Sequence, residues 1–188
     1  MQECYLHDGL CEKFPLPSYT DGMILPAILH RRAVREYKKD PISSEQIEKI
    51  IKAAQFAPTA RNRRAVEFIV VTDRETKTAL SKALLPQEFV KEAPVIIIPV
   101  VNTKVASKPV IDLALASQNI FLQAASMGIG SIWKHVHEES ELGKVRSILG
   151  IPENFLLTNI IPIGYAEVLP PPHTDAEYDA KKIHREKW

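Results

Sequence analysis

One long apolar segment, from Val110 to Met127, limits how this chain can fold. Ser107 and Pro109 set the start of a helix there, and Gly128 follows its end. Apolar side chains occupy nearly every face of this helix, so it should be buried on all sides. A chain of 188 residues has few ways to enclose a whole helix, and we therefore expect a second subunit to cover part of it.

Four further segments are predicted to be helices. They run from Thr20 or Asp21 through the basic segment His30–Arg35, from Ser43 to Pro58, from Asp73 to Pro86, and from Ser140 to Leu149. Ser43 and Gln46 form the pattern of a capping box, and Asp73 is a suitable N-cap residue. The first of these helices would bring three arginines to one place.

Four apolar runs predict strands. They lie at Glu67–Val71, Val95–Val101, Gly130–Val136 and Leu157–Val168. The second run is apolar on both faces, as in a central strand, and Pro99 within it implies a bulge or an unpaired position. Three prolines at 170–172 then stop the pairing, and the tail from His173 to Trp188 is expected to dock because a free tail rarely ends in tryptophan.

Composition predicts one domain, residues 21–172, after an irregular arm at residues 1–20. With 45% hydrophobic residues the chain can bury a core, and a formal net charge of +1 argues against a general nucleic-acid binder. No apolar run approaches the ~20 residues of a membrane-spanning helix, and no signal-peptide pattern is present, so we expect a soluble cytoplasmic protein. Cys4 and Cys11 lack C-x-x-C spacing, which favours free thiols over a bridge or a redox pair.

The loop from Pro58 to Arg64 carries the residues best suited to chemistry. It joins a helix to a buried strand and contains Arg61, Asn62 and Arg63. Asn62 could bind a ligand or merely satisfy its own turn, and the arginines could bind an anion or lie solvated. Residues alone leave both alternatives open.

Two histidines, His135 and His137, alternate on one predicted strand and could suggest a metal pair. No third ligand follows at a suitable spacing. We therefore expect no metal site.

Several short motifs occur together in one order. They are Arg31–Arg35 (RRAVR), Ala57–Asn62 (APTARN), Ala93–Pro94, Gly128–Trp133 (GIGSIW), Ile163–Tyr165 (IGY), and Lys182–His184 with the closing Trp188. In this order and spacing, from about Leu25 to Trp188, the chain resembles the FMN-dependent nitroreductase family. The resemblance implies an α+β, nitroreductase-like three-layer sandwich, in which helices flank a mostly antiparallel central sheet. It also implies an intertwined homodimer with FMN in two sites at the interface.

The same resemblance implies which residues bind the cofactor. The FMN phosphate and the pyrimidine edge of the flavin would be held by the first motif, and Lys182 or its neighbour Lys181 would reach the same phosphate from the tail. The tail would therefore dock on the phosphate site or on the partner subunit. The implied set consists of Arg31, Arg32, Ala33 and Arg35 in the first motif, Pro58, Thr59, Asn62 and Arg64 in a loop lent by the partner, and Ile132, Trp133, Lys134 and His135 along the flavin ring. Backbone amides of that last segment would contact flavin N5 and O4.

Four positions depart from the family pattern. Ala33 replaces a usual serine, Arg61 replaces a typical glycine, the segment at 64–66 replaces Gln-Pro-Trp, and His135 replaces a small residue. These changes leave the main anchors of FMN in place but alter the pocket over the ring.

The resemblance implies a ping-pong oxidoreductase that passes a hydride from NAD(P)H through flavin N5 to an electron-poor acceptor, such as a nitroaromatic or a quinone. No side chain stands out as an obligatory acid or base, because the flavin carries the chemistry. Two alternatives remain. One is a specialised flavoenzyme whose anionic substrate meets Arg61 and Arg63, and the other is a non-catalytic flavin-binding module, suggested by Ala33 and the lost Gln-Pro-Trp.

Overall fold

A computed structural model of the protein describes residues 24–84, 87–136 and 139–188. The helices are α1 (Pro26–His30), α2 (Ser44–Gln55), α3 (Arg74–Ala83), α4 (Glu88–Glu92), α5 (Pro109–Ser126) and α6 (Glu139–Leu149), with short 3-10 turns η2 (Ala60–Asn62), η3 (Asp175–Glu177) and η4 (Ala180–Lys182). The strands are β1 (Val66–Val71), β2 (Val95–Asn102), β3 (Gly130–Ser131), β4 (Lys134–His135), β5 (Phe155–Leu156) and β6 (Asn159–Gly164). The arm at 1–20, with Cys4 and Cys11, lies outside the described residues.

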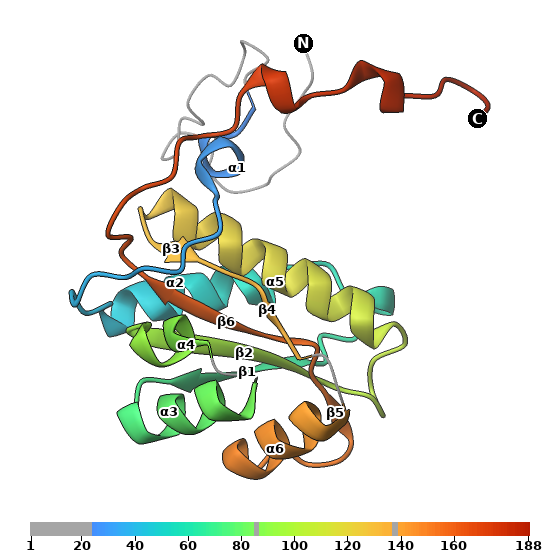
Figure 1. Cartoon of the computed structure of the whole chain (residues 1–188). Coiled ribbons are helices and arrows are strands. Elements are labelled where there is room, and N and C mark those ends of the chain that lie inside the picture. Colours follow the sequence, from blue (N-terminus) through green and yellow to red (C-terminus); the bar gives the residue numbers. More distant parts are fainter. Residues whose placement is uncertain (1–23, 85–86, 137–138) are drawn as a thin grey trace, which may run out of the picture.

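The strands form one antiparallel sheet between two layers of helices (Figure 1). Its order is β1-β2-β6-β3, with β4 paired to β6 and β5 paired to β2. Along β2, Val95 and Ile97 pack against α2 and α5, whereas Ile96 and Ile98 pack towards α3 and α6. Both faces of the central strand are therefore buried, and the predicted three-layer α+β sandwich is confirmed.

Two helices, α2 and α3, begin at the N-cap residues that the sequence predicts. The amide of Gln46 donates to Ser43 Oγ at 3.2 Å while the Ser43 amide donates to Gln46 Oε1 at 3.0 Å, so the capping box of α2 is confirmed. The Thr76 amide donates to Asp73 Oδ2 at 2.7 Å at the start of α3. Each cap satisfies backbone donors that the first helical turn leaves unpaired.

The predicted first helix is wrong over its basic segment. Helix α1 ends at His30, and Arg31 already has extended dihedral angles (φ −66°, ψ 110°). The residues that follow run beside β3 instead, since Ala33 forms a parallel bridge with Ser131 and the Val34 amide donates to the Ser131 carbonyl at 3.1 Å. Pairing with this strand satisfies backbone groups that a longer helix would have paired internally.

Two predicted strands are shorter than expected. The segment 130–136 is split into β3 and β4, although the Val136 amide still donates to the Thr158 carbonyl at 3.0 Å. Strand β6 spans Asn159–Gly164, and beyond it Ala166 forms only an isolated bridge with Tyr37. The short elements α4 and β5 were not predicted.

Pro99 causes no bulge. The register of β1 against β2 continues through the Phe68–Pro99 pair without an extra residue. On the other edge of β2, pairing with β6 covers residues 95–97 and pairing with β5 covers residues 101–102. Pro99 is therefore paired with β1 on one edge and lies, on the other edge, where neither β6 nor β5 pairs with β2.

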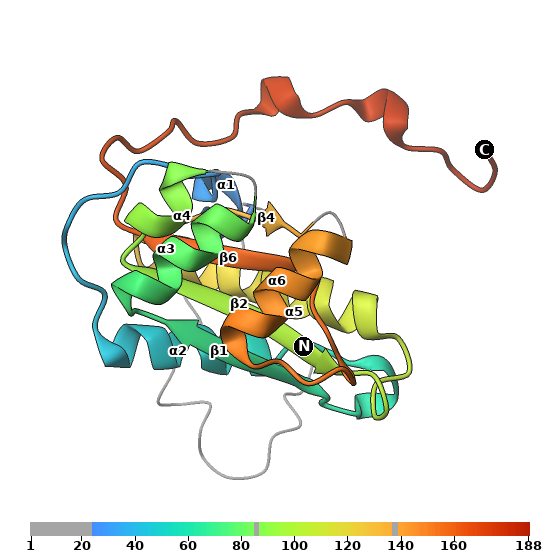
Figure 2. The same ribbon diagram turned by 60° about the horizontal axis from the view of Figure 1, so that its bottom comes forward.

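The tail leaves the body of the molecule after the three prolines and projects from it in both views (Figures 1 and 2). Trp188 is 99% exposed and stacks on His184, with ring centroids 4.0 Å apart. Within its own chain this tryptophan does not dock on the domain, so docking on a partner subunit stays a prediction.

Candidate functional site

The arginine segment, residues 31–35, lines one small cavity at the C-terminal end of α5. This arginine cavity has a volume of 160 Å³, and its lining includes Arg31, Arg32, Ala125, Ser131 and Pro170. The segment is held close to β3, and the Tyr37 hydroxyl donates to the Val34 carbonyl at 2.8 Å. Two of the predicted phosphate ligands are therefore brought together beside a buried serine hydroxyl.

The other predicted members of this group lie outside the cavity. Ala33 and Arg35 are exposed on the same segment. Lys181 and Lys182 belong to η4 in the projecting tail and are exposed, so in their own chain they do not line the arginine cavity. Their predicted contact with the phosphate remains a prediction.

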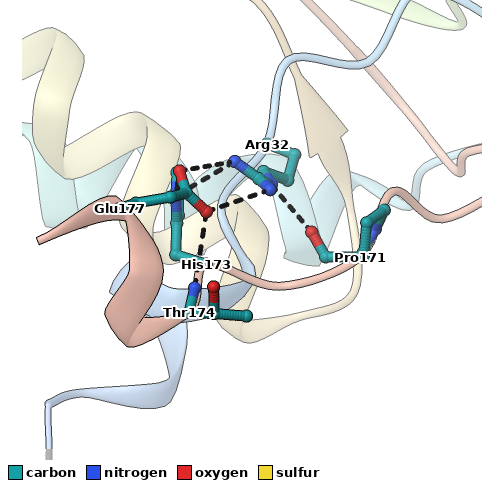
Figure 3. Close-up of polar contacts among 5 residues, drawn as sticks. All are labelled: Arg32, Pro171, His173, Thr174 and Glu177. Carbon is teal, nitrogen blue, oxygen red and sulfur yellow. Dashed lines mark hydrogen bonds and ion pairs between the residues drawn. The ribbon is translucent and has the colours of Figure 1, made fainter.

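Arg32 is bound by the start of the tail, which we call the tail clasp: Pro171, His173 and Glu177 (Figure 3). Its Nε–H donates to the Pro171 carbonyl at 2.7 Å, and its two terminal nitrogens lie 3.3 and 3.4 Å from the two Glu177 carboxylate oxygens. His173 Nδ1 lies 2.7 Å from Glu177 Oε2 and 3.0 Å from Arg32. A single ring nitrogen either donates to Glu177 or accepts from Arg32.

The carboxylate of the tail clasp is stabilised in its charged form. The hydrogen bond with His173 is the main cause that holds the pKa of Glu177 below its ordinary value, followed by the Thr174 amide and the charge of Arg32. Hydrogen bonds and a nearby cation both favour a carboxylate over a carboxylic acid. Sequence reasoning missed this cluster, because no local pattern connects a glutamate in the tail with the first motif.

The segment from Ile132 to His135 runs along β6, and its side chains point in different directions. Trp133 is half-exposed, with its ring centroid 6.2 Å from that of Phe121, whereas Lys134 is buried and donates to the His135 carbonyl at 2.8 Å. The Ile132 amide donates to the Pro162 carbonyl at 3.2 Å. This amide is thus used by the sheet, and the contact of the segment's backbone amides with a flavin stays a prediction.

The loop from Pro58 to Arg64 is held in shape by its own polar groups. Thr59 accepts twice: its carbonyl from the Asn62 amide at 2.8 Å and its hydroxyl from the Arg64 amide at 3.0 Å. Asn62 Oδ1 accepts from Arg64 Nε at 3.1 Å. Asn62 therefore does serve its own turn. Within the loop, the oxygen of its side-chain amide accepts this hydrogen bond.

A second cavity of 480 Å³, the loop cavity, lies under this loop. Its lining includes Phe56, Pro58, Thr59, Asn62, Arg64 and Ala116. All four residues predicted to be lent to a partner's flavin thus face one cavity. Arg61 and Arg63 are exposed and do not line it.

Asp112 in α5 fixes the loop from below and was missed by sequence reasoning. It is fully buried, and its Oδ1 accepts from the Ala60 amide at 2.9 Å. Its Oδ2 has no hydrogen-bond partner among the described residues. One signal for it was present in the sequence: an aspartate in the first turn of a helix that is otherwise apolar. A charged group is rarely buried unless it binds a polar partner.

The two cavities lie at different points along α5. The arginine cavity borders Ala125 and the loop cavity borders Ala116, which are nine residues and so about 14 Å apart along the helix axis. A third cavity of 620 Å³, bordered by His30, Asn119 and Gln123, lies between them. One chain therefore presents two separate cavities that are lined by residues of the predicted flavin-binding set.

Among the described residues, no cluster of three or more potential metal ligands occurs. His137 lies outside these residues. No helix of the described segments is long and apolar enough to cross a membrane.

Replacing Arg61 by glycine is expected to stabilise the protein by about 0.5–1 kcal/mol. Arg61 has φ 58° and ψ 24°, a left-handed conformation that costs an L-residue about 1–2 kcal/mol, and glycine adopts it freely but with a larger loss of entropy. Arg63 in the same loop has φ −73° and ψ −22°, so Arg63→Gly is a matched control that should lower stability. Chemical denaturation measures the free energy of unfolding of both variants. Equal effects of the two substitutions would contradict backbone strain at Arg61.

Solved structures define the class of protein to which this fold belongs. An FMN-dependent nitroreductase from Clostridium difficile R20291 superposes with a TM-score of 0.82 at 30% identity, over 88% of this chain and all of that one. The sequence model of the nitroreductase family matches residues 28–87 and 78–165. The chain belongs to the nitroreductase family, and the resemblance seen in its motifs is confirmed.

Two relatives are similar over most of their length. A provisionally named NADH dehydrogenase/NAD(P)H nitroreductase of Archaeoglobus fulgidus is 38% identical over 170 residues, which are 87% of this chain and 98% of the relative. An NADH dehydrogenase of Thermus thermophilus is 29% identical over 176 residues, which are 74% of this chain and 84% of the relative.

Proposed function

We propose that the protein is an FMN-dependent NAD(P)H oxidoreductase that acts as a homodimer and reduces an electron-poor acceptor, such as a nitroaromatic or a quinone, by a ping-pong mechanism. The observation that carries the proposal is the arginine cavity, which is lined by Arg31, Arg32 and Ser131. Guanidinium groups bind phosphate through paired N–H donors, so this donor set fits the phosphate of FMN.

The size of the cavity agrees with such a role. At 160 Å³ it is smaller than the ~300 Å³ at which sites for whole cofactors begin, so it fits the phosphate end alone. The flavin would then extend along α5 towards the larger 620 Å³ cavity.

A homodimer would unite the arginine cavity of one subunit with the loop cavity of the other, so that each cavity forms half of a flavin site. The exposed face of the first half of α5 is apolar, with Val110, Ile111 and Leu115. A two-fold axis that packs two α5 helices antiparallel would bring the loop of one subunit beside the arginine segment of the other. Thr59 and Asn62 are neutral, and each can hydrogen-bond the polar edge of a flavin without the cost of a buried charge. The names of the relatives and the FMN-dependent structural neighbour support this reading.

The residues of the chain bind and orient rather than react. When bound, FMN would supply the redox chemistry that links NAD(P)H to the acceptor. Arg31 and Arg32 would hold its phosphate, Arg35 would place positive charge beside its pyrimidine edge, and the loop from the partner would cover one side of its ring. Protons come from water.

A second candidate is an oxidoreductase specialised for an anionic acceptor. Arg61 and Arg63 are both exposed on a loop that three internal hydrogen bonds and the bond to Asp112 keep in one shape. Two exposed cations on the loop that lines the loop cavity would favour a carboxylate, sulfonate or phosphate on the acceptor.

The proposed function predicts that purified protein retains FMN and that NADH or NADPH bleaches it without oxygen. Menadione should then restore the yellow colour, and a naphthoquinone sulfonate should do so at lower concentration if the second candidate is correct. The measurements are gel filtration with added FMN and anaerobic stopped-flow spectroscopy. Failure to retain FMN would contradict the proposal, and a bound flavin that stays oxidised with both nucleotides would favour a non-catalytic flavin-binding module.

A further inference from the structure

The tail clasp leaves Arg32 without a free edge for a phosphate. A guanidinium group offers two edges at which paired N–H groups point the same way: the end with its two terminal nitrogens, and the side that includes Nε. Glu177 takes the end, since its two oxygens lie 3.3 and 3.4 Å from the two terminal nitrogens. The Pro171 carbonyl takes Nε at 2.7 Å on the side (Figure 3).

Arg32 also lines the arginine cavity, where the phosphate would bind. A phosphate grips arginine best through two parallel N–H bonds, the arrangement that the Glu177 carboxylate already uses. No carboxylate in the described part of the chain forms a salt bridge with Arg31 or Arg35, the other two arginines of the segment.

We propose that Glu177 competes with the flavin phosphate for the end of Arg32 and thereby sets how strongly the site prefers FMN over a flavin without a phosphate. This inference rests on the proposed function, because it takes the arginine cavity as the phosphate site. Glu177 is then a specificity-determining residue in the tail.

The charges of the phosphate and of the Glu177 carboxylate decide which of them binds Arg32. A phosphate monoester carries about −1.5 to −2 charges at neutral pH, compared with −1 for a carboxylate, so it displaces Glu177 from Arg32. The displaced carboxylate must give up a partly exposed ion pair, which is a modest cost. Riboflavin does not reach Arg32 with a charged group and leaves the pair intact. Glu177 therefore weakens the binding of FMN but not that of riboflavin.

Glu177→Gln is expected to tighten FMN binding roughly three- to tenfold and to leave riboflavin binding within twofold, because the neutral amide binds guanidinium less strongly. The full-length protein, stripped of flavin, is titrated with FMN and with riboflavin, and quenching of flavin fluorescence gives Kd. Glu186→Gln removes the same charge from the same tail at an exposed position and should change neither value. Unchanged or weaker FMN binding by Glu177→Gln would overturn the inference.

Arg32→Ala separates this inference from the function on which it rests. It should weaken FMN binding and spare riboflavin. If Arg32→Ala weakens FMN binding and Glu177→Gln fails to tighten it, Glu177 is not a competitor but the phosphate site stands. If Arg32→Ala leaves FMN binding unchanged, the phosphate lies elsewhere, and the proposed site and the inference fall together.

Discussion

Replacing Gly130 by alanine is expected to lower the free energy of unfolding by about 1–3 kcal/mol and to weaken FMN binding at least about tenfold. An added Cβ would lie 2.6, 2.8 and 2.9 Å from Val34 Cγ2, Cβ and Cγ1. Because Val34 Cβ is itself one of these atoms, no change of rotamer relieves the clash. The arginine segment must move away from β3, and since Val34 lies between Arg32 and Arg35, the phosphate ligands move with it.

Gly143 provides the matched control. It lies inside α6, and an added Cβ would meet nothing within 4 Å. Gly143→Ala should raise stability by about 0.5–1 kcal/mol, because alanine favours a helix more than glycine does, and it should leave FMN binding unchanged. Urea denaturation and FMN titration measure both variants. Wild-type stability of Gly130→Ala would show that Val34 does not hold the arginine segment against β3.

The elements that sequence predicted well are those fixed by neighbouring residues. The Ser43–Gln46 box and the Asp73 cap act within one helical turn, so they could be recognised before any tertiary contact was known. The error at Arg31–Arg35 has the opposite origin. A basic stretch that follows an apolar helical pattern predicts a continued helix. Its true pairing partner, Ser131, lies far along the chain and could not be recognised from neighbouring residues.

The sequence predicted the main residues of the candidate site but not the contacts that hold them in place. The motifs indicated the arginines and the polar loop, and the structure places members of each at a cavity. Two acidic residues were missed, Asp112 under the loop and Glu177 on Arg32, because each acts through a contact that depends on the completed fold. Neither acidic residue belongs to a motif that the chain shares with the family, so the resemblance did not point to them.

Helix α5 links the fold to the proposed dimer. The sequence predicted burial on all sides, but in the single chain Val110, Ile111 and Leu115 are 57%, 55% and 38% exposed. The opposite face, with Leu113, Ile120 and others, is buried in the chain's own core. An exposed apolar helix face of this kind is typical of an interaction surface, and it lies in the N-terminal half of α5, directly before Ala116 of the loop cavity.

Replacing both Ile111 and Leu115 by glutamate is expected to give a folded monomer whose FMN affinity is lower by about a hundredfold or more. In a two-fold dimer each substitution enters the interface twice, and like charges buried together are strongly unfavourable. The arginine segment remains intact, but the partner's loop no longer completes the site. Light scattering after gel filtration and FMN titration measure the two effects, with circular dichroism to verify folding. Ser147→Glu on the exposed side of α6 is the charge control and should remain a dimer with wild-type affinity. A double variant that binds FMN normally as a monomer would mean that one chain forms the whole site.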